Sequence, residues 1–222
     1  MDKTGIRDAA SVILLRDIDT SPQVLVGQRG KSAAFMPSKF VFPGGAVETS
    51  DGVPDLTGAL DTICLRRLRD RADPELAPKL LGAALRELWE ETGLRLSHPG
   101  TPLDLPHWSG FAEGGHVPSA DGLSFVFRAI TPPGRPRRFD ARFFLVEASR
   151  ITGDPDDFSR ASNELGHLQW VPLTDIRKFD LPFITEVILA EIAALLRDGK
   201  RRPDGVPFFD NATTTSAFLR LE

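Results

Sequence analysis

The chain has 222 residues, with 27 lysines and arginines against 31 aspartates and glutamates and a formal net charge of −4. This length suits one well-cored domain, and an acidic balance without a basic run argues against nucleic acid as a partner. No apolar stretch is long enough for a membrane span, and the single cysteine, Cys64, excludes an intramolecular disulfide framework and favours a reducing compartment, so we expect a cytoplasmic protein.

The N-terminal part of the chain predicts three strands and a glycine turn. Its first residues contain too short an apolar run for a signal peptide. Residues 9–15 (AASVILL) are typical of a buried strand, and residues 23–29 (QVLVGQR) alternate enough for a second strand, so the pair predicts a hairpin. Residues 40–42 predict a third strand that ends at a Pro-Gly-Gly turn (43–45), where the glycines permit close approach of the backbone to a ligand.

A charged stretch follows and predicts one helix, roughly residues 56–70. Its arginines form a local basic cluster, which either steers phosphates or is an ordinary solvated helix face. These arginines are Arg66, Arg67, Arg69 and Arg71. Asp73-Pro74 and Pro78 then interrupt the chain, because proline is tolerated at the start of a helix but not inside it.

Residues 81–94 (LGAALRELWEETGL) predict an amphipathic helix that stops at Gly93. At about 100° per residue, Glu87, Glu90 and Glu91 cluster on one side, opposite an apolar side. Three carboxylates so close together repel one another unless a divalent cation lies among them, and oxygen ligands suit Mg²⁺ or Mn²⁺. The alternative is a solvated acidic face on an ordinary helix. The opposite side comprises Leu81, Leu85, Leu88, Trp89 and Thr92.

A proline-rich passage, residues 98–118, comes next. Its Trp108 and Phe111 either stack on a base or pack beneath a loop. Residues 124–130 and 139–146 then predict two strands of a second hairpin.

The C-terminal part predicts one more helix, residues 182–197 (PFITEVILAEIAALLR), with Asp180 as its N-cap. Its broad apolar stripe should pack on the other side of the sheet. For the tail from residue 199 onward the sequence predicts a loop.

Two segments together resemble a known family. Residues 86–94 (RELWEETGL) match every fixed position in the second half of the Nudix box, G-x5-E-x7-R-E-U-x-E-E-x-G-U, where U is a bulky aliphatic residue. Residues 42–45 (FPGG) resemble the strand end and glycine turn that open the box. Asp51 stands where the pattern has Glu, and Arg86 follows Asp51 by 35 positions instead of eight, so about 27 residues are inserted. A similar interruption occurs in a branch that includes the peroxisomal coenzyme A diphosphatases.

The resemblance implies a fold and a reaction. The fold is α/β: a Nudix-type α/β/α sandwich with a mixed β-sheet and a helical insertion, as a single domain over residues 1–222 with the insertion at about 52–79. The reaction is metal-dependent hydrolysis of a diphosphate linked to another moiety, for which coenzyme A or a nucleotide derivative is a candidate. The implied cofactor is Mg²⁺ or Mn²⁺.

The resemblance also implies the metal ligands. Carried over to this sequence, they are Glu87, Glu90 and Glu91 on the helix and a carbonyl of the glycine turn, which falls on Gly44. Family members often add an acid in a loop before a Trp-containing strand, and here Glu164 fits this position.

The same resemblance implies catalytic roles. Glu90 or Glu164 accepts the proton of the attacking water, and Arg86 orients a glutamate through a paired bond, with Asp51 as its partner. Glu147 is the main competitor of Glu164. His167 is either a base or a solvent-facing loop residue.

A second class of function is left open. A non-catalytic Nudix-like module would bind a ligand or regulate a partner, but such modules usually lose acids of the box. For the enzyme we expect a small-molecule diphosphate as substrate, neither nucleic acid nor membrane as partner, and a homodimer as one alternative for the oligomeric state.

Overall fold

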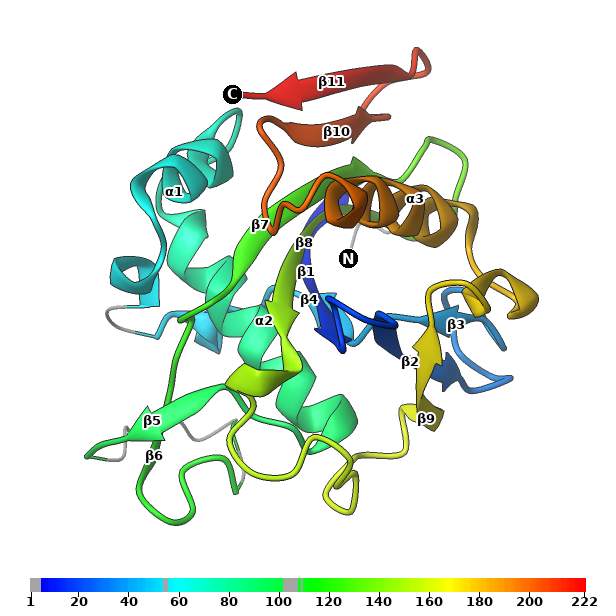
Figure 1. The fold of residues 1–222 in the computed structure, drawn as a ribbon. Helices are drawn as coiled ribbons and strands as arrows, with labels where there is room; N and C mark the ends of the chain where they lie inside the picture. Colours follow the sequence, from blue (N-terminus) through cyan, green and yellow to red (C-terminus); the bar gives the residue numbers. More distant parts are fainter. Residues whose placement is uncertain (1–4, 54–55, 102–107, 109) are drawn as a thin grey trace.

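The computed structural model describes residues 5–53, 56–101, 108 and 110–222 (Figure 1). The strands of this part are β1 (Ile6–Arg16), β2 (Gln23–Arg29), β3 (Phe40–Val41), β4 (Gly44–Ala46), β5 (Ser97–Pro99), β6 (His116–Pro118), β7 (Ser124–Ile130), β8 (Arg138–Glu147), β9 (Leu165–Pro172), β10 (Val206–Asp210) and β11 (Ala217–Leu221). Its α-helices are α1 (Thr62–Arg69), α2 (Leu76–Thr92) and α3 (Phe183–Arg197).

In the described part of the chain, nine strands form one mixed sheet. Their order is β11-β10-β7-β8-β1-β2-β3, with β4 also pairing with β1 and β9 with β2. β1 and β8 run parallel, as do β7 and β10, whereas the other neighbours are antiparallel. Both predicted hairpins, β1–β2 and β7–β8, are confirmed.

Helices cover both faces of the sheet, and β1 shows how its side chains divide between them. Val12 and Leu14 join the apolar cluster that contains α2, while Ile13 and Leu15 join the cluster that contains α3. This alternation follows from the period of two in a strand. The α/β/α sandwich with a mixed sheet is therefore confirmed, and Figure 1 shows α2 and α3 on either side of the central strands.

Helix α2 begins earlier than the sequence predicted. Its first residue is Leu76, so Pro78 lies inside the first turn, where its missing N–H costs no helical hydrogen bond. The predicted stop is confirmed: Gly93 adopts the left-handed conformation (φ 75°) and its N–H donates to Trp89 O at 2.8 Å.

The insertion differs from the single helix predicted over residues 56–70. It contains a 3₁₀ turn at Leu56–Ala59 and then α1. Cys64 is buried, and its Sγ accepts a hydrogen bond from Phe125 N–H of β7 at 3.3 Å. Arg67 is also buried, and its Nη1 donates to Pro203 O at 2.8 Å. Arg67 therefore ties the insertion to the C-terminal segment and does not belong to a phosphate-steering surface.

The C-terminal prediction needs two corrections. The tail is not a loop, because β10 pairs with β7 and β11 extends the sheet edge. Asp180 does not cap α3: the N-cap is Pro182, without a side-chain bond, and the Asp180 carboxylate pairs with Lys39.

Trp108 and Phe111 belong to the core. Both are buried, and their rings pack edge to face with centroids 5.1 Å apart. Phe111 also packs against Trp89 of α2 at 5.8 Å. The packing interpretation is therefore confirmed over base stacking. Among the described helices, none combines the length and the apolar character that a membrane crossing requires.

Candidate active site

The acids of α2 lie against the glycine turn because glycine is the residue type that leaves room there. A Cβ atom on Gly45 would lie 2.1 Å from Glu87 Oε1, far inside van der Waals contact. Strand β4, which carries Gly44 and Gly45, pairs with β1 and so is held at the centre of the sheet. The two halves of the interrupted motif thus meet in space.

Glu91 is the deepest of the three helix acids, with 1% of its surface exposed. Its Oε2 accepts a hydrogen bond from Gly44 N–H at 2.7 Å. Its Oε1 is buried and has no hydrogen-bond partner among the described residues. A buried carboxylate oxygen without a donor is costly, so this atom marks a place where a ligand is expected.

Arg86 fixes the orientation of the neighbouring acids. Its Nη1 donates to Glu87 Oε1 at 3.0 Å and to Glu90 Oε2 at 2.9 Å. On its other edge, Nε and Nη2 donate to the two oxygens of Asp51 at 2.7 and 3.2 Å. Nη2 also donates to Ala46 O at 3.2 Å, so every nitrogen of this guanidinium is used.

Asp51 reaches Arg86 although its side chain is one methylene shorter than the glutamate of the motif. It is fully buried, and its Oδ2 also accepts a hydrogen bond from Glu48 N–H at 2.7 Å. The backbone makes up the missing length, because Asp51 O lies so close to Gly82 of α2 that a Cβ there would be 1.9 Å away. The absence of a side chain at Gly82 therefore lets the Asp51 backbone approach α2, so that the shorter Asp51 side chain reaches Arg86.

Burial and mutual repulsion disfavour ionisation of two of the acids. Burial raises the pKa of Glu87 to about 7, although Arg86 opposes the shift. Burial, with the charge of Glu87, raises the pKa of Glu91 to about 8. A cation among these carboxylates would reverse both shifts.

The donor set fits a hard divalent cation. Carboxylate oxygens are the preferred ligands of Mg²⁺ and Mn²⁺, and Glu91 Oε1 is buried, unpartnered and beside Glu87. In the described part of the chain no three His, Cys, Asp or Glu side chains already converge as a cluster. Glu87 and Glu90 are instead drawn toward Arg86 at 3.0 and 2.9 Å, and Gly44 meets Glu91 through its N–H.

The structure brings Glu164 toward the same acids. Ser162 N–H donates to Glu90 O at 2.8 Å, which ties the loop before β9 to the end of α2. The Glu164 charge contributes to the raised pKa of both Glu87 and Glu91, so its carboxylate lies near enough to interact with theirs. Glu164 itself is exposed.

The two other candidates for this role differ in position. His167 is exposed, and its left-handed backbone (φ 50°) coincides with an irregularity in the pairing of β9 with β2. Glu147, the competitor of Glu164, is exposed at the end of β8 and pairs with Arg201 at 3.2 Å. The structure thus links Glu164, and not Glu147, to the helix acids.

Sequence reasoning missed one residue of this site. The charge of Arg29, the last residue of β2, opposes the raised pKa of Glu91, so the guanidinium lies near this acid. Its Nε is buried and has no hydrogen-bond partner in the described part of the chain. The available signal was an arginine at the end of a predicted strand, which does not show what the side chain faces.

The chain is similar to known proteins in sequence and in fold. No family model matches the chain. Over 178 residues, 74% of the chain, the sequence is 29% identical to the Caenorhabditis elegans protein named "Putative nudix hydrolase 7"; the match covers 51% of that protein, so the chain spans about half the length of this curated relative.

Solved structures with the same fold are also known. A NUDIX hydrolase from Alicyclobacillus acidocaldarius superposes with a TM-score of 0.62 at 28% identity, over 87% of this chain and 96% of that chain. The NUDIX domain of Shewanella oneidensis NrtR, solved with ADP ribose, has a TM-score of 0.50 at 13% identity, over 86% of this chain and 89% of that chain. The second likeness concerns the fold alone.

Proposed function

Because the chain belongs to the Nudix hydrolase superfamily, we propose that it is a metal-dependent hydrolase that cleaves a diphosphate linked to another moiety. The observation that carries this proposal is the unpartnered, buried Oε1 of Glu91 beside the glycine turn. An ordinary acidic helix face would leave its carboxylates in water, whereas this one buries an acceptor with nothing to accept from.

Glu91 and Glu87 would hold the metal, with Glu90 and Gly44 at its margin. A bound Mg²⁺ or Mn²⁺ ion would neutralise phosphate charge and acidify a bound water. Glu87 and Glu90 must turn from Arg86 toward the ion, a change that side-chain rotation allows because Glu90 is 39% exposed.

The chain's own groups supply positioning and proton transfer. Asp51 holds Arg86 in place, and in the metal-free site Arg86 in turn holds Glu87 and Glu90. Exposed Glu164 is the acceptor for the proton of the attacking water, because it reaches solvent while facing the buried acids. Arg29, with a free Nε, is placed to bind a phosphate oxygen and to stabilise charge that develops there.

Coenzyme A or an acyl derivative is the first substrate class to test, because the interruption of the box resembles that branch. The insertion gives little information about the substrate. Its helix α1 packs against β7 and the segment at residue 203, at the opposite end of α2 from the acids. The loops over residues 31–39 and 153–164 lie closer to the site and are the better candidates for substrate walls. A cytoplasmic location, a homodimer and a single domain with an insertion at about 52–79 stay predictions.

The alternative function is a binding module without turnover. The Nudix domain of NrtR was solved in complex with ADP ribose. The acids retained here favour the enzyme. Tight ligand binding with no turnover under either metal would favour the module.

Hydrolysis across a substrate panel tests the proposal. Coenzyme A, acyl-coenzyme A, ADP-ribose, NADH, dinucleoside polyphosphates and nucleoside triphosphates would each be incubated with Mg²⁺, with Mn²⁺ and with a chelator. We expect metal-dependent turnover of one class, lost in Glu91→Gln and kept in Glu186→Gln, which removes an exposed acid of α3. Turnover that persists in folded Glu91→Gln would contradict the assignment.

A further inference from the structure

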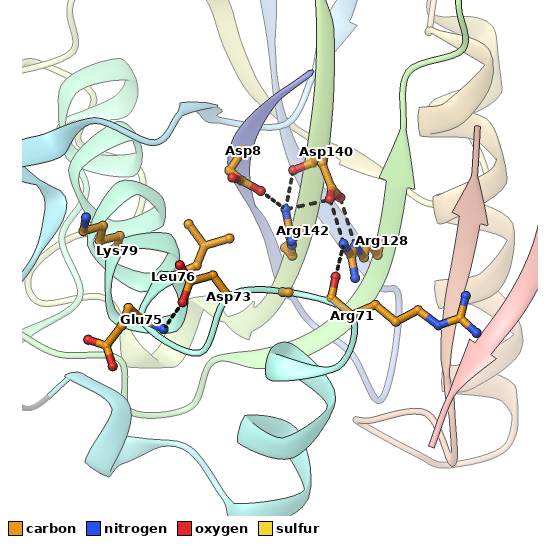
Figure 2. A pocket seen from close by; sticks show the side chains of 10 residues that line it. Asp8, Arg71, Asp73, Glu75, Leu76, Lys79, Arg128, Asp140 and Arg142 are labelled. Carbon is orange, nitrogen blue, oxygen red and sulfur yellow. Dashed lines mark hydrogen bonds and ion pairs between the residues drawn. The ribbon is translucent and has the colours of Figure 1, made fainter. Parts of the chain in front are cut away.

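An open cavity of about 320 Å³ lies beside the first turn of α2 (Figure 2). Leu76, the first residue of the helix, lines it, whereas Glu87 lies 11 residues further along. At the rise of an α-helix that separation is about 16 Å. The cavity is therefore distinct from the candidate active site.

The floor of the cavity is a network of two arginines and two aspartates. Arg128 of β7 forms a bidentate pair with Asp140 of β8, at 2.9 and 2.7 Å. Arg142, two residues along β8, approaches Asp140 at 3.2 Å and also pairs with Asp8 of β1. The four charges cancel, so this floor attracts neither anions nor cations by its net charge.

Arg142 nevertheless lacks a partner on one side. The residue is 1% exposed, and its Nε is buried without a hydrogen-bond partner among the described residues. Burial, together with the nearby charge of Arg128, lowers the pKa of Arg142. A buried donor without an acceptor is costly, and an acceptor arriving from the cavity would offset that cost.

The walls of the cavity favour an anionic acceptor. The first turn of α2 presents the positive end of the helix dipole, and its N-cap, Glu75, makes no side-chain capping bond. Lys79 lines the cavity one turn into the helix and forms no ion pair with any described residue. Figure 2 shows Lys79 and Arg142 on opposite sides of the opening.

The remaining acids do not close the cavity to an anion. Asp8 and Asp140 are engaged by the arginines, and Asp73 Oδ1 accepts a hydrogen bond from Glu75 N–H at 2.9 Å. The exposed side chain of Glu75 points away from the two floor arginines in Figure 2. These acids therefore engage neither Lys79 nor Arg142 Nε among the described residues.

We propose that this cavity binds a phosphate oxyanion, either inorganic phosphate or the phosphate of a phosphomonoester, between Arg142 and Lys79 at the N-terminus of α2. A tetrahedral phosphate offers several acceptor oxygens at once, which suits donors that approach from two sides. The site would be a second anion site, separate from the one that acts on diphosphates.

Thermal unfolding of the metal-free full chain tests this site. The melting temperature is measured against the concentration of inorganic phosphate, and in a second series of glycerol 3-phosphate, with potassium chloride at matched ionic strength as the reference. A ligand that binds the folded state raises the melting temperature by mass action. Either compound alone or both together would support the site, and the pattern tells which source of phosphate it accepts.

Three variants locate the binding. Lys79→Glu should weaken the apparent affinity at least about tenfold, because it replaces a charged donor by a like charge. Lys178→Glu, a charge reversal at an exposed lysine elsewhere, should leave the affinity unchanged. Arg29→Ala tests binding at the active site and should also leave it unchanged.

Two results would overturn the proposal. One is the absence of any phosphate-dependent shift in the wild-type protein. The other is a shift that survives Lys79→Glu, because phosphate would then bind elsewhere. Lys79 is chosen over Arg142 because Arg142 also holds Asp8 and Asp140, and its loss would endanger the fold itself.

Discussion

Two buried arginines, Arg86 and Arg142, occupy similar networks and differ in one respect. Each pairs with acids of neighbouring elements, and both are almost completely buried. Every nitrogen of Arg86 has a partner, and the surrounding acids raise its pKa despite the opposing effect of burial. Arg142 leaves Nε unpartnered, and burial lowers its pKa.

The difference separates scaffold from site. A buried cation whose donors are all used holds its neighbours in place and has nothing to offer a ligand. A buried polar atom without a partner is expected to find one in water, an ion or a ligand. The same criterion selects Glu91 Oε1 and Arg29 Nε beside the Arg86 network, and it also selects Arg67 Nε and Trp108 Nε1, which lie in packed parts of the fold.

The largest expected effect is a loss of activity when Glu91, which carries the unpartnered Oε1, is replaced. Glu91→Gln should lower kcat/KM roughly a hundredfold to a thousandfold, a loss comparable to that of other groups that stabilise charge in the transition state. The metal-free variant should be at least as stable as the wild type, because the amide removes a buried charge with a raised pKa of about 8. Steady-state kinetics and urea unfolding of the same samples measure both; a variant that loses stability together with activity would contradict a ligand role.

The next largest effect is a loss of stability when Arg86, whose guanidinium nitrogens all have partners, is replaced. Arg86→Met leaves fully buried Asp51 without its partner and should cost about 3–5 kcal/mol of unfolding free energy. Arg150→Met is the matched control, because Arg150 pairs with Asp121 at the surface and should contribute less than about 1 kcal/mol. Equal losses in urea unfolding would mean that the Arg86 network is not the scaffold described here.

A smaller loss of stability is expected from a substitution at Gly82, which packs against Asp51. Gly82→Ala raises helix propensity by about 1 kcal/mol, but the new Cβ would lie 1.9 Å from Asp51 O. The clash should dominate, so the variant should be destabilised by about 1–3 kcal/mol. Gly52→Ala, where a Cβ meets nothing within 4 Å, is the control. If urea unfolding showed Gly82→Ala to be the more stable variant, the close contact with Asp51 would be wrong.

A further effect is a slope of stability with pH in the metal-free protein. Glu87 and Glu91 have folded pKa values of about 7 and about 8, above the ordinary 4.5. Between these limits the folded state binds more protons than the unfolded state, so stability should fall as pH rises from about 4.5 to 8. Unfolding free energies measured across this range with a chelator should show the decline, and Glu91→Gln should flatten it. A flat wild-type profile would contradict the burial of these charges.

The elements with local signals were predictable. The β1–β2 and β7–β8 hairpins and the apolar side of α2 follow from periodicity, and Gly93 marks the end of α2. Strands β10 and β11 were missed, because pairing of β10 with β7 joins residues far apart in sequence and Pro207 argues against a strand.

The site was predictable in its acids but not in its contacts. The spacing of Glu87, Glu90 and Glu91 indicates a shared side, yet it cannot show that Glu91 is buried while Glu90 is only partly buried. The proximity of residues from distant segments, such as Arg29 and Glu91, arises from tertiary packing, which a local sequence pattern does not show.

The most direct test of the central claim is the affinity of the metal-free protein for Mn²⁺, measured by calorimetry for the wild type, Glu91→Gln and Glu186→Gln. If Glu91 Oε1 is a metal ligand, the wild type and Glu186→Gln should bind Mn²⁺ with the same affinity, and Glu91→Gln should bind it at least about tenfold more weakly, as expected when a charged ligand is lost. Equal affinities in all three proteins would contradict the claim that the unpartnered oxygen of Glu91 marks the metal site.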